Sequence, residues 1–422
     1  WLAAKPDPTA AAMRMYLSLS ERVKVIWYEA SSAINGPALF ERLNVGRIPL
    51  TDAELVKALL LARARTDGRG REHHLASQWD AVERDLRHPE TWAFISGQVG
   101  ETWSHIGLLL DTLAENPHQK GDPLYYTFER LRPAIDTDPE GFWAEVLDLH
   151  ALVMGWFDDR ELYHLVGFLV SQGMTLAELV ALSRDKPKSE FQALLVDRVK
   201  ERLDLTPSQL QDLRYTSQKT STALLLMNVA TVLQSKHSSE HYPFSTQAAG
   251  HWSLEHIHAQ RAQALNTEDQ WRTWLRLHLD SLVGLPNVDP ASVEAIRARI
   301  PTNGQPLIRK LFQELERDTL HLYARAGQDL EGDVDAIDNL ALLSTDQNSA
   351  LNNSVFEVKR RSIIRLDKEG QFIPPCTRNA FLKYYSEVSG QHNHFWGRSD
   401  RSDYLTAMTS ILSPYLKDEI NE

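Results

Sequence analysis

Two histidines flank one isoleucine in the stretch "WSLEHIHAQ" (residues 252–260), and a glutamate comes directly before the first of them. Hydrolysis of a phosphodiester needs a base that takes a proton from water near neutral pH, and histidine is the side chain suited to that task. It also needs a cation that neutralises the charge developing on the phosphate. The stretch therefore predicts a catalytic base at His256 and, at Glu255, a hard oxygen ligand for Mg²⁺ or Mn²⁺.

A second polar segment, "DNLALLSTDQNSALNN" (338–353), completes this predicted site. The alternation of Leu340 and Leu342 predicts a short strand that Asn339 opens, followed by a turn that delivers Asn348 to the start of a helix. The amide oxygen of Asn348 is another hard ligand for a divalent cation. Glu255 and His256 are therefore expected to meet Asn339 and Asn348 in one site.

Two further histidines have competing interpretations. His258 would emerge on the same side of a strand as His256, because side chains alternate along a strand. A zinc His-x-His pair is one alternative, but Cys376, the only thiol in the chain, lies far from it in sequence. We therefore expect His258 to support the site from behind or to contact DNA. His164 lies within an apolar helical pattern and is expected to be a core histidine.

The elements that must position these residues are mainly helical. Four helix-start signals place a threonine three residues before a glutamate or glutamine, the spacing of a capping box, at Thr51, Thr175, Thr206 and Thr267. The loop "SKHSSEHYP" (235–243) is the best domain boundary. We predict three domains, which span residues 1–61, 62–235 and 236–422.

Composition limits the function classes. Of 422 residues, 42% are hydrophobic and 24% charged, which is an ordinary globular balance. The net charge of -12 argues against general affinity for nucleic acid, because lysines and arginines make the phosphate contacts. A DNA-facing surface must then be local, and "VKRRSIIR" (358–365) or the arginines of "ARARTDGRGR" (62–71) could supply it. A solvated charged face is the alternative for either stretch.

Cellular location follows from cysteine usage and from the absence of certain signals. A lone Cys376 excludes an intramolecular disulfide, and the chain shows no charged-then-apolar leader. No apolar run approaches the roughly 20 residues that a membrane helix needs. We therefore expect a cytoplasmic protein with no membrane partner. A chain that begins at Trp1 is expected to continue a longer protein.

Several segments together resemble a known nuclease family. "LEHIHAQ", "DNLALLSTDQNSALNN" and "FEVKRR" (356–361) resemble the His, Asn and Asn/His segments of an HNH (ββα-metal) nuclease. The chain is similar over most of its length to GmrSD-type, modification-dependent (type IV) restriction endonucleases and to related phosphorothioate-sensing anti-phage nucleases. The segments that carry this wider similarity are "FERLNVGRIPLTDAELVKALLL" (40–61), "FDDRELYHLVGFL" (157–169), "HYPFS" (241–245), "FIPPCTRNAFLKYYS" (372–386) and "FWGRSDRSDYL" (395–405).

The resemblance implies a role for each matching residue. His256 would be the general base, and Asn339 would brace the loop and orient that imidazole. Glu255 and Asn348 would hold one divalent cation per site, Mg²⁺ or Mn²⁺. Helical spacing favours Asn352 as a further contributor, whereas the family register points to Asn353. Lys359, Arg360 and Arg361 would grip the DNA backbone.

The implied fold is mainly α and multi-domain, with a C-terminal ββα-metal (HNH) core and a long helical insertion between its two strands. Residues 1–61 would be the tail of a ParB-like regulatory domain. The family's Asp-Gly-Gln-Gln-Arg segment, tied to nucleotide hydrolysis, is absent here, so any nucleotide is expected in an upstream segment. Glu255 stands where many HNH proteins have Asp or His, and Ala259 stands where many have Pro. These differences leave the metal identity open.

Three function hypotheses follow. The first is a metal-dependent DNA endonuclease or nickase of a prokaryotic anti-phage restriction system that responds to modified double-stranded DNA. The second is a nucleotide-regulated DNA-binding or assembly module whose nuclease site is degenerate. The third is an RNA-directed nuclease. Further partners expected from the resemblance are a second copy of the chain, an upstream domain or a partner subunit.

Overall fold

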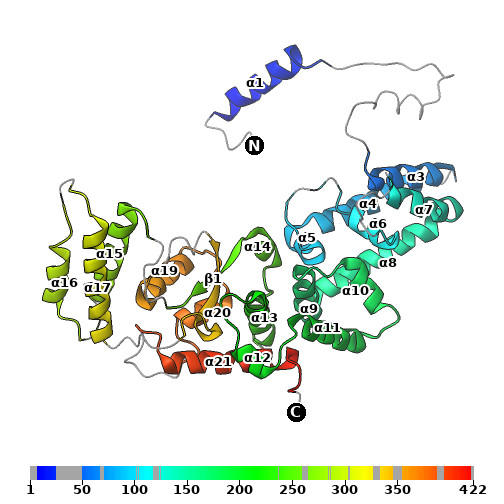
Figure 1. The fold of residues 1–422 in the computed structure, drawn as a ribbon. Helices are drawn as coiled ribbons and strands as arrows, with labels where there is room; N and C mark the ends of the chain where they lie inside the picture. The colour runs from blue at the N-terminus through cyan, green and yellow to red at the C-terminus, as the bar shows by residue number, and fades with distance from the viewer. Residues whose placement is uncertain are drawn as a thin grey trace. The chain divides into compact units, whose positions relative to one another are not determined.

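The secondary structure is mainly helical with one small two-stranded sheet, as the sequence predicts (Figure 1). This computed structural model describes residues 7–24, 50–66, 71–100, 102, 104–116, 123, 125–235, 237–258, 265–283, 285, 287–302, 305–326, 333–345, 354–386 and 394–419. The chain divides into two compact units, Trp1–Thr51 and Asp52–Glu422. The first unit contains helix α1 (Pro8–Glu21), which Asp7 caps by accepting a hydrogen bond from the backbone N–H of Ala10.

The second unit begins with the helices that precede the sheet. They are α3 (Asp52–Thr66), α4 (Arg71–Arg87), α5 (Pro89–Ser96), α6 (Gly107–Leu113), α7 (Tyr126–Thr137), α8 (Pro139–Asp158), α9 (Arg160–Ser171), α10 (Leu176–Ser183), α11 (Lys188–Leu203), α12 (Pro207–Gln211), α13 (Gln218–Gln234) and α14 (Phe244–Ala249). The capping boxes predicted at Thr175, Thr206 and Thr267 are confirmed. No described helix combines the length and the apolar character that crossing a bilayer requires.

The sheet is built from strands that lie far apart in the sequence. Strand β1 (Trp252–His256) pairs antiparallel with β2 (Leu340–Ser344), and the register sets Glu255 opposite Ala341 and His256 opposite Leu340. Between the strands, the chain forms α15 (Glu268–Leu282), α16 (Pro290–Arg297) and α17 (Arg309–Arg325). After β2 come α19 (Phe356–Lys368), α20 (Pro375–Phe381) and α21 (Arg398–Leu412), with 3₁₀ turns η2 (Ile337–Asn339) and η3 (Ser413–Tyr415). The two strands of the sheet are thus separated along the chain by three helices, and α19 follows β2.

Helix α13 anchors the sheet to the larger of two hydrophobic cores. It is buried over most of its length and contacts α9, α20, α21 and β2. Its one buried amide, Asn228, accepts a hydrogen bond from the backbone N–H of Cys376 at 2.8 Å and so ties α13 to α20. Helices α13 and α20 both contact β2, and its residues from Leu340 to Leu343 are all buried, so packing covers both faces of the strand.

The hydrophobic cores do not follow the predicted domain boundaries. One core runs from Ala53 in α3 to Leu416 after η3 without a break near residue 235. The predicted boundary at residue 61 falls inside α3, which packs against α4 and α7. A second core joins α15, α16 and α17 to Val355 and Val358 at the start of α19. These three helices therefore hold the beginning of α19 in place.

Two buried histidines act as hydrogen-bonding links between elements. The Nδ1 atom of His164 lies 2.6 Å from the carbonyl of Arg160, and its Nε2 accepts from the backbone N–H of Tyr242 at 3.1 Å. His278 repeats this arrangement with the carbonyl of Trp274 and the N–H of Val355. His164 is thus a core histidine, as predicted. Burial lowers the pKa of His164 to about 4 and that of His278 to about 3.

Acidification should destabilise the second unit through these histidines. In the unfolded chain they take up a proton near pH 6.5, whereas in the folded protein they stay neutral until about pH 4 and pH 3. For each histidine, the free energy of unfolding should fall by about 1.4 kcal/mol per pH unit as the pH drops from its unfolded-state pKa to its folded-state pKa. Urea denaturation at several pH values between 6.5 and 4 measures this slope.

The substitution His278→Gln separates this effect from the titration of carboxylates. The variant should be less stable at pH 8 but should lose stability less steeply on acidification, because one buried neutral imidazole is gone. His73→Gln, at an exposed position on α4, is the matched control and should keep the wild-type slope. Equal slopes for His278→Gln and wild type would contradict this explanation of acid sensitivity.

Candidate functional site

Asn339 holds the loop that follows β1. Its side-chain oxygen accepts a hydrogen bond from the backbone N–H of His258 at 3.0 Å, and its Nδ2 donates to the carbonyls of His258 at 2.9 Å and Val334 at 2.8 Å. Its own carbonyl accepts from the N–H of Ile257 at 2.8 Å. Asn339 is 2% exposed. It therefore braces the loop as predicted, although none of these bonds goes to the imidazole of His256.

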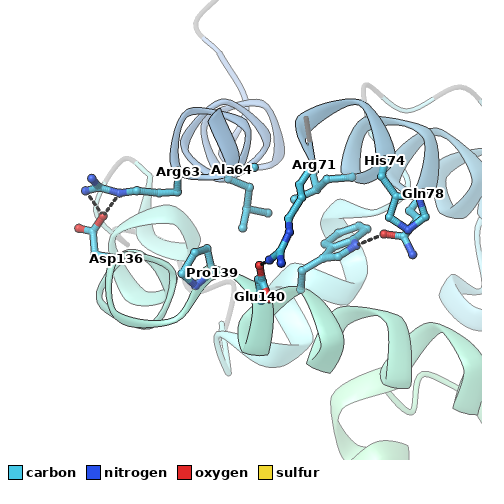
Figure 2. A pocket seen from close by; sticks show the side chains of 11 residues that line it. Arg63, Ala64, Arg71, His74, Gln78, Asp136, Pro139 and Glu140 are labelled. Atoms are coloured by element: carbon cyan, nitrogen blue, oxygen red, sulfur yellow. Dashed lines mark hydrogen bonds and ion pairs between the residues drawn. The ribbon is translucent and has the colours of Figure 1, made fainter. Parts of the chain in front are cut away.

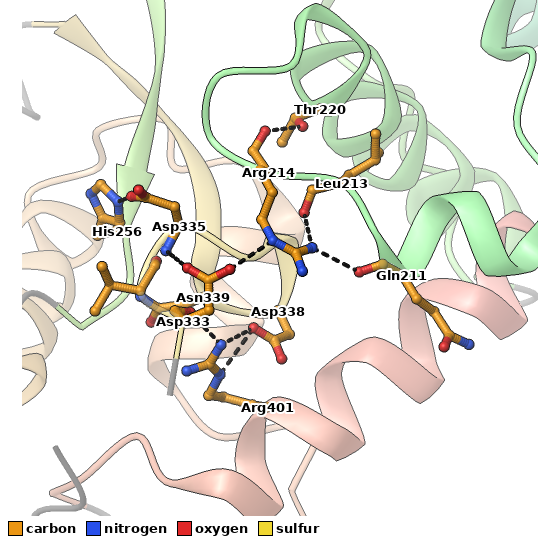
Figure 3. Close-up of polar contacts among 11 residues, drawn as sticks. Gln211, Leu213, Arg214, Thr220, His256, Asp333, Asp335, Asp338, Asn339 and Arg401 are labelled. Atoms are coloured by element: carbon orange, nitrogen blue, oxygen red, sulfur yellow. Dashed lines mark hydrogen bonds and ion pairs between the residues drawn. The ribbon is translucent and has the colours of Figure 1, made fainter. Parts of the chain in front are cut away.

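The imidazole of His256 lies at the end of β1 and is half-buried. Its Nε2 is 2.9 Å from Oδ1 of Asp335, a residue in the turn before β2 (Figure 3). The ring of Tyr215 stacks on it, with centroids 4.9 Å apart and planes 11° from parallel. His256 is thus oriented by a carboxylate and an aromatic ring.

Arginines neutralise the acidic turn that carries Asp335 (Figure 3). The Nε atom of Arg214 lies 2.7 Å from Oδ2 of Asp333. Arg401 of α21 donates to the Asp338 carboxylate at 2.5 and 2.9 Å and to the carbonyl of Asp333 at 2.6 Å. Two of the three carboxylates in this turn are therefore ion-paired with arginine, whereas Asp335 faces the histidine.

Glu255, next to His256, belongs to the opposite face of β1 and is buried. Its carboxylate forms an ion pair with Nζ of Lys359 from α19, and the same Nζ donates to the carbonyl of His256 at 2.6 Å. Burial lowers the pKa of the Lys359 ammonium, while the charge and hydrogen bond of Glu255 oppose that shift. The pair fastens α19 to the end of β1.

The burial of Lys359 corrects one prediction. Lys359 is 1% exposed, so it cannot reach a DNA backbone, and the predicted phosphate contact is wrong. The sequence pattern missed this because α15 packs on α19 and the Lys359 ammonium reaches Glu255 and the carbonyl of His256 at the end of β1. Arg361 is exposed but bonded to Glu357 at 2.7 Å, and Arg360 is mostly buried. DNA contact by these two arginines stays a prediction.

His258 is corrected in a similar way. Strand β1 ends at His256, so the alternation that would place both histidines on one side does not reach His258. His258 is 5% exposed, and its Nδ1 accepts from the backbone N–H of Phe356 at 3.4 Å, at the start of α19. Contact of His258 with DNA is therefore wrong, whereas support of the site from behind stays a prediction.

The predicted metal site is only partly described. Asn348, Asn352 and Asn353 lie outside the described residues. Among the residues that the structure describes, no three His, Cys, Asp or Glu side chains gather to hold a metal ion. Glu255, the one predicted ligand that is described, is already neutralised by Lys359. The described residues alone therefore do not form a fitting site for Mg²⁺ or Mn²⁺.

The other basic stretch borders a separate pocket of about 500 Å³ between α3, α4, α7 and α8. Figure 2 shows Arg63 bonded to Asp136 and Arg71 directed toward Glu140 across this pocket. The hydrogen bond from Arg63 lowers the pKa of Asp136. Arg63 and Arg71 are thus paired with carboxylates, whereas Arg65 is exposed and Arg69 lies outside the described residues. A DNA-facing surface and a solvated charged face both stay open for this stretch.

Comparison with protein-family models, with curated proteins and with solved structures finds no match for this chain. The resemblance to HNH nucleases therefore depends on the quoted residues alone.

Asp335 and Tyr215 contact the predicted base, yet no motif in the sequence marks either of them as a site residue. Tyr215 precedes α13 and lies far from His256 in sequence, so only tertiary structure reveals the contact. Asp335 has a weak local signal, because the acidic run "DVDAID" (333–338) comes directly before the predicted strand. An acidic run before a strand reads equally well as a solvated turn.

The Glu255–Lys359 pair should contribute strongly to stability. The substitution Lys359→Met leaves a buried carboxylate unpaired and should lower the free energy of unfolding by about 3–5 kcal/mol. Adding Glu255→Gln to it should recover part of that loss, because the orphaned charge is removed. Urea denaturation of both single variants and the double variant measures the coupling.

Lys368→Met is the matched control, since Lys368 is an exposed lysine in the same helix. It should change stability by no more than about 0.5 kcal/mol. Should Lys359→Met prove as stable as this control, the buried ion pair would not be formed in solution.

Proposed function

We propose that this protein is a metal-dependent DNA endonuclease or nickase of a prokaryotic anti-phage restriction system that responds to modified DNA. The observation that carries the proposal is the His256 imidazole, held by a carboxylate at the end of β1, where the Glu255–Lys359 pair fastens the strand to α19. The family resemblance of the "LEHIHAQ" and "DNLALLSTDQN" segments supports the same chemistry.

The chemistry assigned to the described residues is proton transfer. His256 is half-buried, so its ring is restrained by its neighbours yet reached by water. As general base it would remove a proton from a water molecule as that water attacks phosphorus. Asn339 would keep the loop after β1 in the conformation that presents this ring. Mg²⁺ or Mn²⁺ would supply Lewis-acid stabilisation of the phosphate. Of its two predicted ligands, Asn348 lies outside the described residues, and Glu255 would first have to be released from Lys359.

The local charges favour a cation-assisted reaction. Asp333, Asp335 and Asp338 lie in the turn before β2, and the chain as a whole carries a net charge of -12. Arg214 and Arg401 offset only Asp333 and Asp338. A polyanionic strand approaching His256 would therefore meet net negative charge unless a divalent cation is present.

A second candidate function is a DNA-binding or assembly module, regulated by nucleotide, in which the nuclease site is degenerate. The Glu255–Lys359 pair is the observation that favours it, because the ammonium holds the carboxylate that a metal would need. The two candidates differ in one measurable property. Only the nuclease should relax supercoiled plasmid with Mg²⁺ or Mn²⁺ and lose that activity with EDTA.

The substitution His256→Ala should lower the nicking rate by about 100-fold or more, because it removes the base, while the protein remains folded. Supercoiled plasmid with Mg²⁺ or Mn²⁺ is the substrate, and circular dichroism checks folding. His73→Ala should cleave at the wild-type rate. Equal nicking by His256→Ala and wild type would exclude His256 as the base.

Parallel reactions on plain DNA, on modified or phosphorothioated DNA and on RNA define the substrate class. Faster cleavage of modified DNA is expected from the restriction hypothesis. Binding of DNA without cleavage under any metal condition would favour the degenerate module, and cleavage confined to RNA would favour an RNA-directed nuclease.

A further inference from the structure

The imidazole of His256 is contacted at one nitrogen only. Nε2 lies 2.9 Å from Oδ1 of Asp335. The described residues provide no hydrogen-bond partner for Nδ1. This nitrogen is not a buried atom that lacks a partner, because it is accessible to solvent. A carboxylate accepts hydrogen bonds and does not donate them when ionised. Nε2 must therefore carry the proton, and Nδ1 presents its lone pair to water.

Asp335 is held in position through its backbone, although its side chain is half-exposed. Its carbonyl accepts from the N–H of Tyr215 at 2.8 Å, and its own N–H donates to Oδ1 of Asp333 at 3.0 Å. Arg214 fixes the Asp333 carboxylate in turn. The segment that supplies Tyr215, the ring stacked on His256, is therefore also the segment that fixes Asp335.

We propose that Asp335 is the positioning residue of His256: it fixes the Nε2–H tautomer, so that Nδ1 is the atom that takes the proton. This assignment rests on the proposed nuclease function. In the step, water transfers a proton to Nδ1 while its oxygen bonds to phosphorus. The P–O bond to the leaving oxygen breaks, and that oxygen takes a proton from solvent. Asp335 stabilises the imidazolium that results.

The neighbouring charged groups are compatible with this role. Asp333 and Asp338, in the same turn, are neutralised by Arg214 and Arg401. Behind the strand, Lys359 is paired with Glu255 and bonded to the carbonyl of His256, not to its ring. Asp335 is therefore the charged group in direct contact with the imidazole among the described residues.

Nuclear magnetic resonance of ¹⁵N-histidine-labelled protein tests the tautomer without any need for activity. At pH 8, without metal, His256 should show a protonated Nε2 and an unprotonated Nδ1. Asp335→Ala and Asp335→Asn should shift the ring toward a mixture of tautomers. Asp338→Asn changes a residue of the same turn that does not touch the imidazole. In this variant His256 should keep the tautomer that it has in the wild type.

Nicking assays of the same variants provide the second measurement. Asp335→Ala should cleave about 100-fold more slowly than wild type, and Asp338→Asn should lose far less activity. A wild-type Nδ1–H tautomer, an unchanged tautomer in Asp335→Ala, or wild-type cleavage by that variant would overturn the assignment. If no DNA is cleaved by the wild type, the nuclease proposal fails, and the tautomer measurement still decides whether Asp335 positions His256.

Discussion

The side chain of Asn339 joins the loop after β1 to the turn before β2, two segments that lie far apart in the sequence. It pairs with both the N–H and the carbonyl of His258 after β1, and with the carbonyl of Val334 in the turn before β2. Buried backbone groups left unpaired cost about 1–3 kcal/mol each, so this one amide fixes the geometry of the loop and the turn together. Because the same turn carries Asp335, the bond network of Asn339 indirectly sets Asp335 against the imidazole of His256.

The two faces of β1 perform different tasks. Glu255 points into the interior, where Lys359 neutralises it and attaches α19 to the strand, whereas His256 points toward Tyr215 and the acidic turn. An ion pair of this kind is costly to bury and costly to break, which makes α19 a firm support for the strand end. It also means that a divalent cation would have to replace the Lys359 ammonium before Glu255 could coordinate it.

The sequence predicted what depends on local pattern and failed where packing decides. The extended stretch at Glu255 and His256, the strand opened by Asn339 and three capping boxes follow from spacing and are observed. The burial of Lys359 follows instead from helices α15 to α17 packing on the start of α19, which no charge pattern in "VKRRSIIR" reveals. Strand β1 ends two residues before His258, so the alternation of side chains along a strand does not predict where this imidazole lies. Asp335 and Tyr215 reach His256 only through the tertiary fold.

We propose that the end of β1, at His256, is where a divalent cation and a phosphodiester meet. Titration with paramagnetic Mn²⁺, observed through the histidine ring signals, tests it most directly. The His256 signals, assigned with the His256→Ala variant, should broaden at substoichiometric Mn²⁺, while those of His73 on α4 and the buried His164 stay sharp. Broadening that spares His256 while it affects other histidines would place the cation elsewhere and contradict the claim.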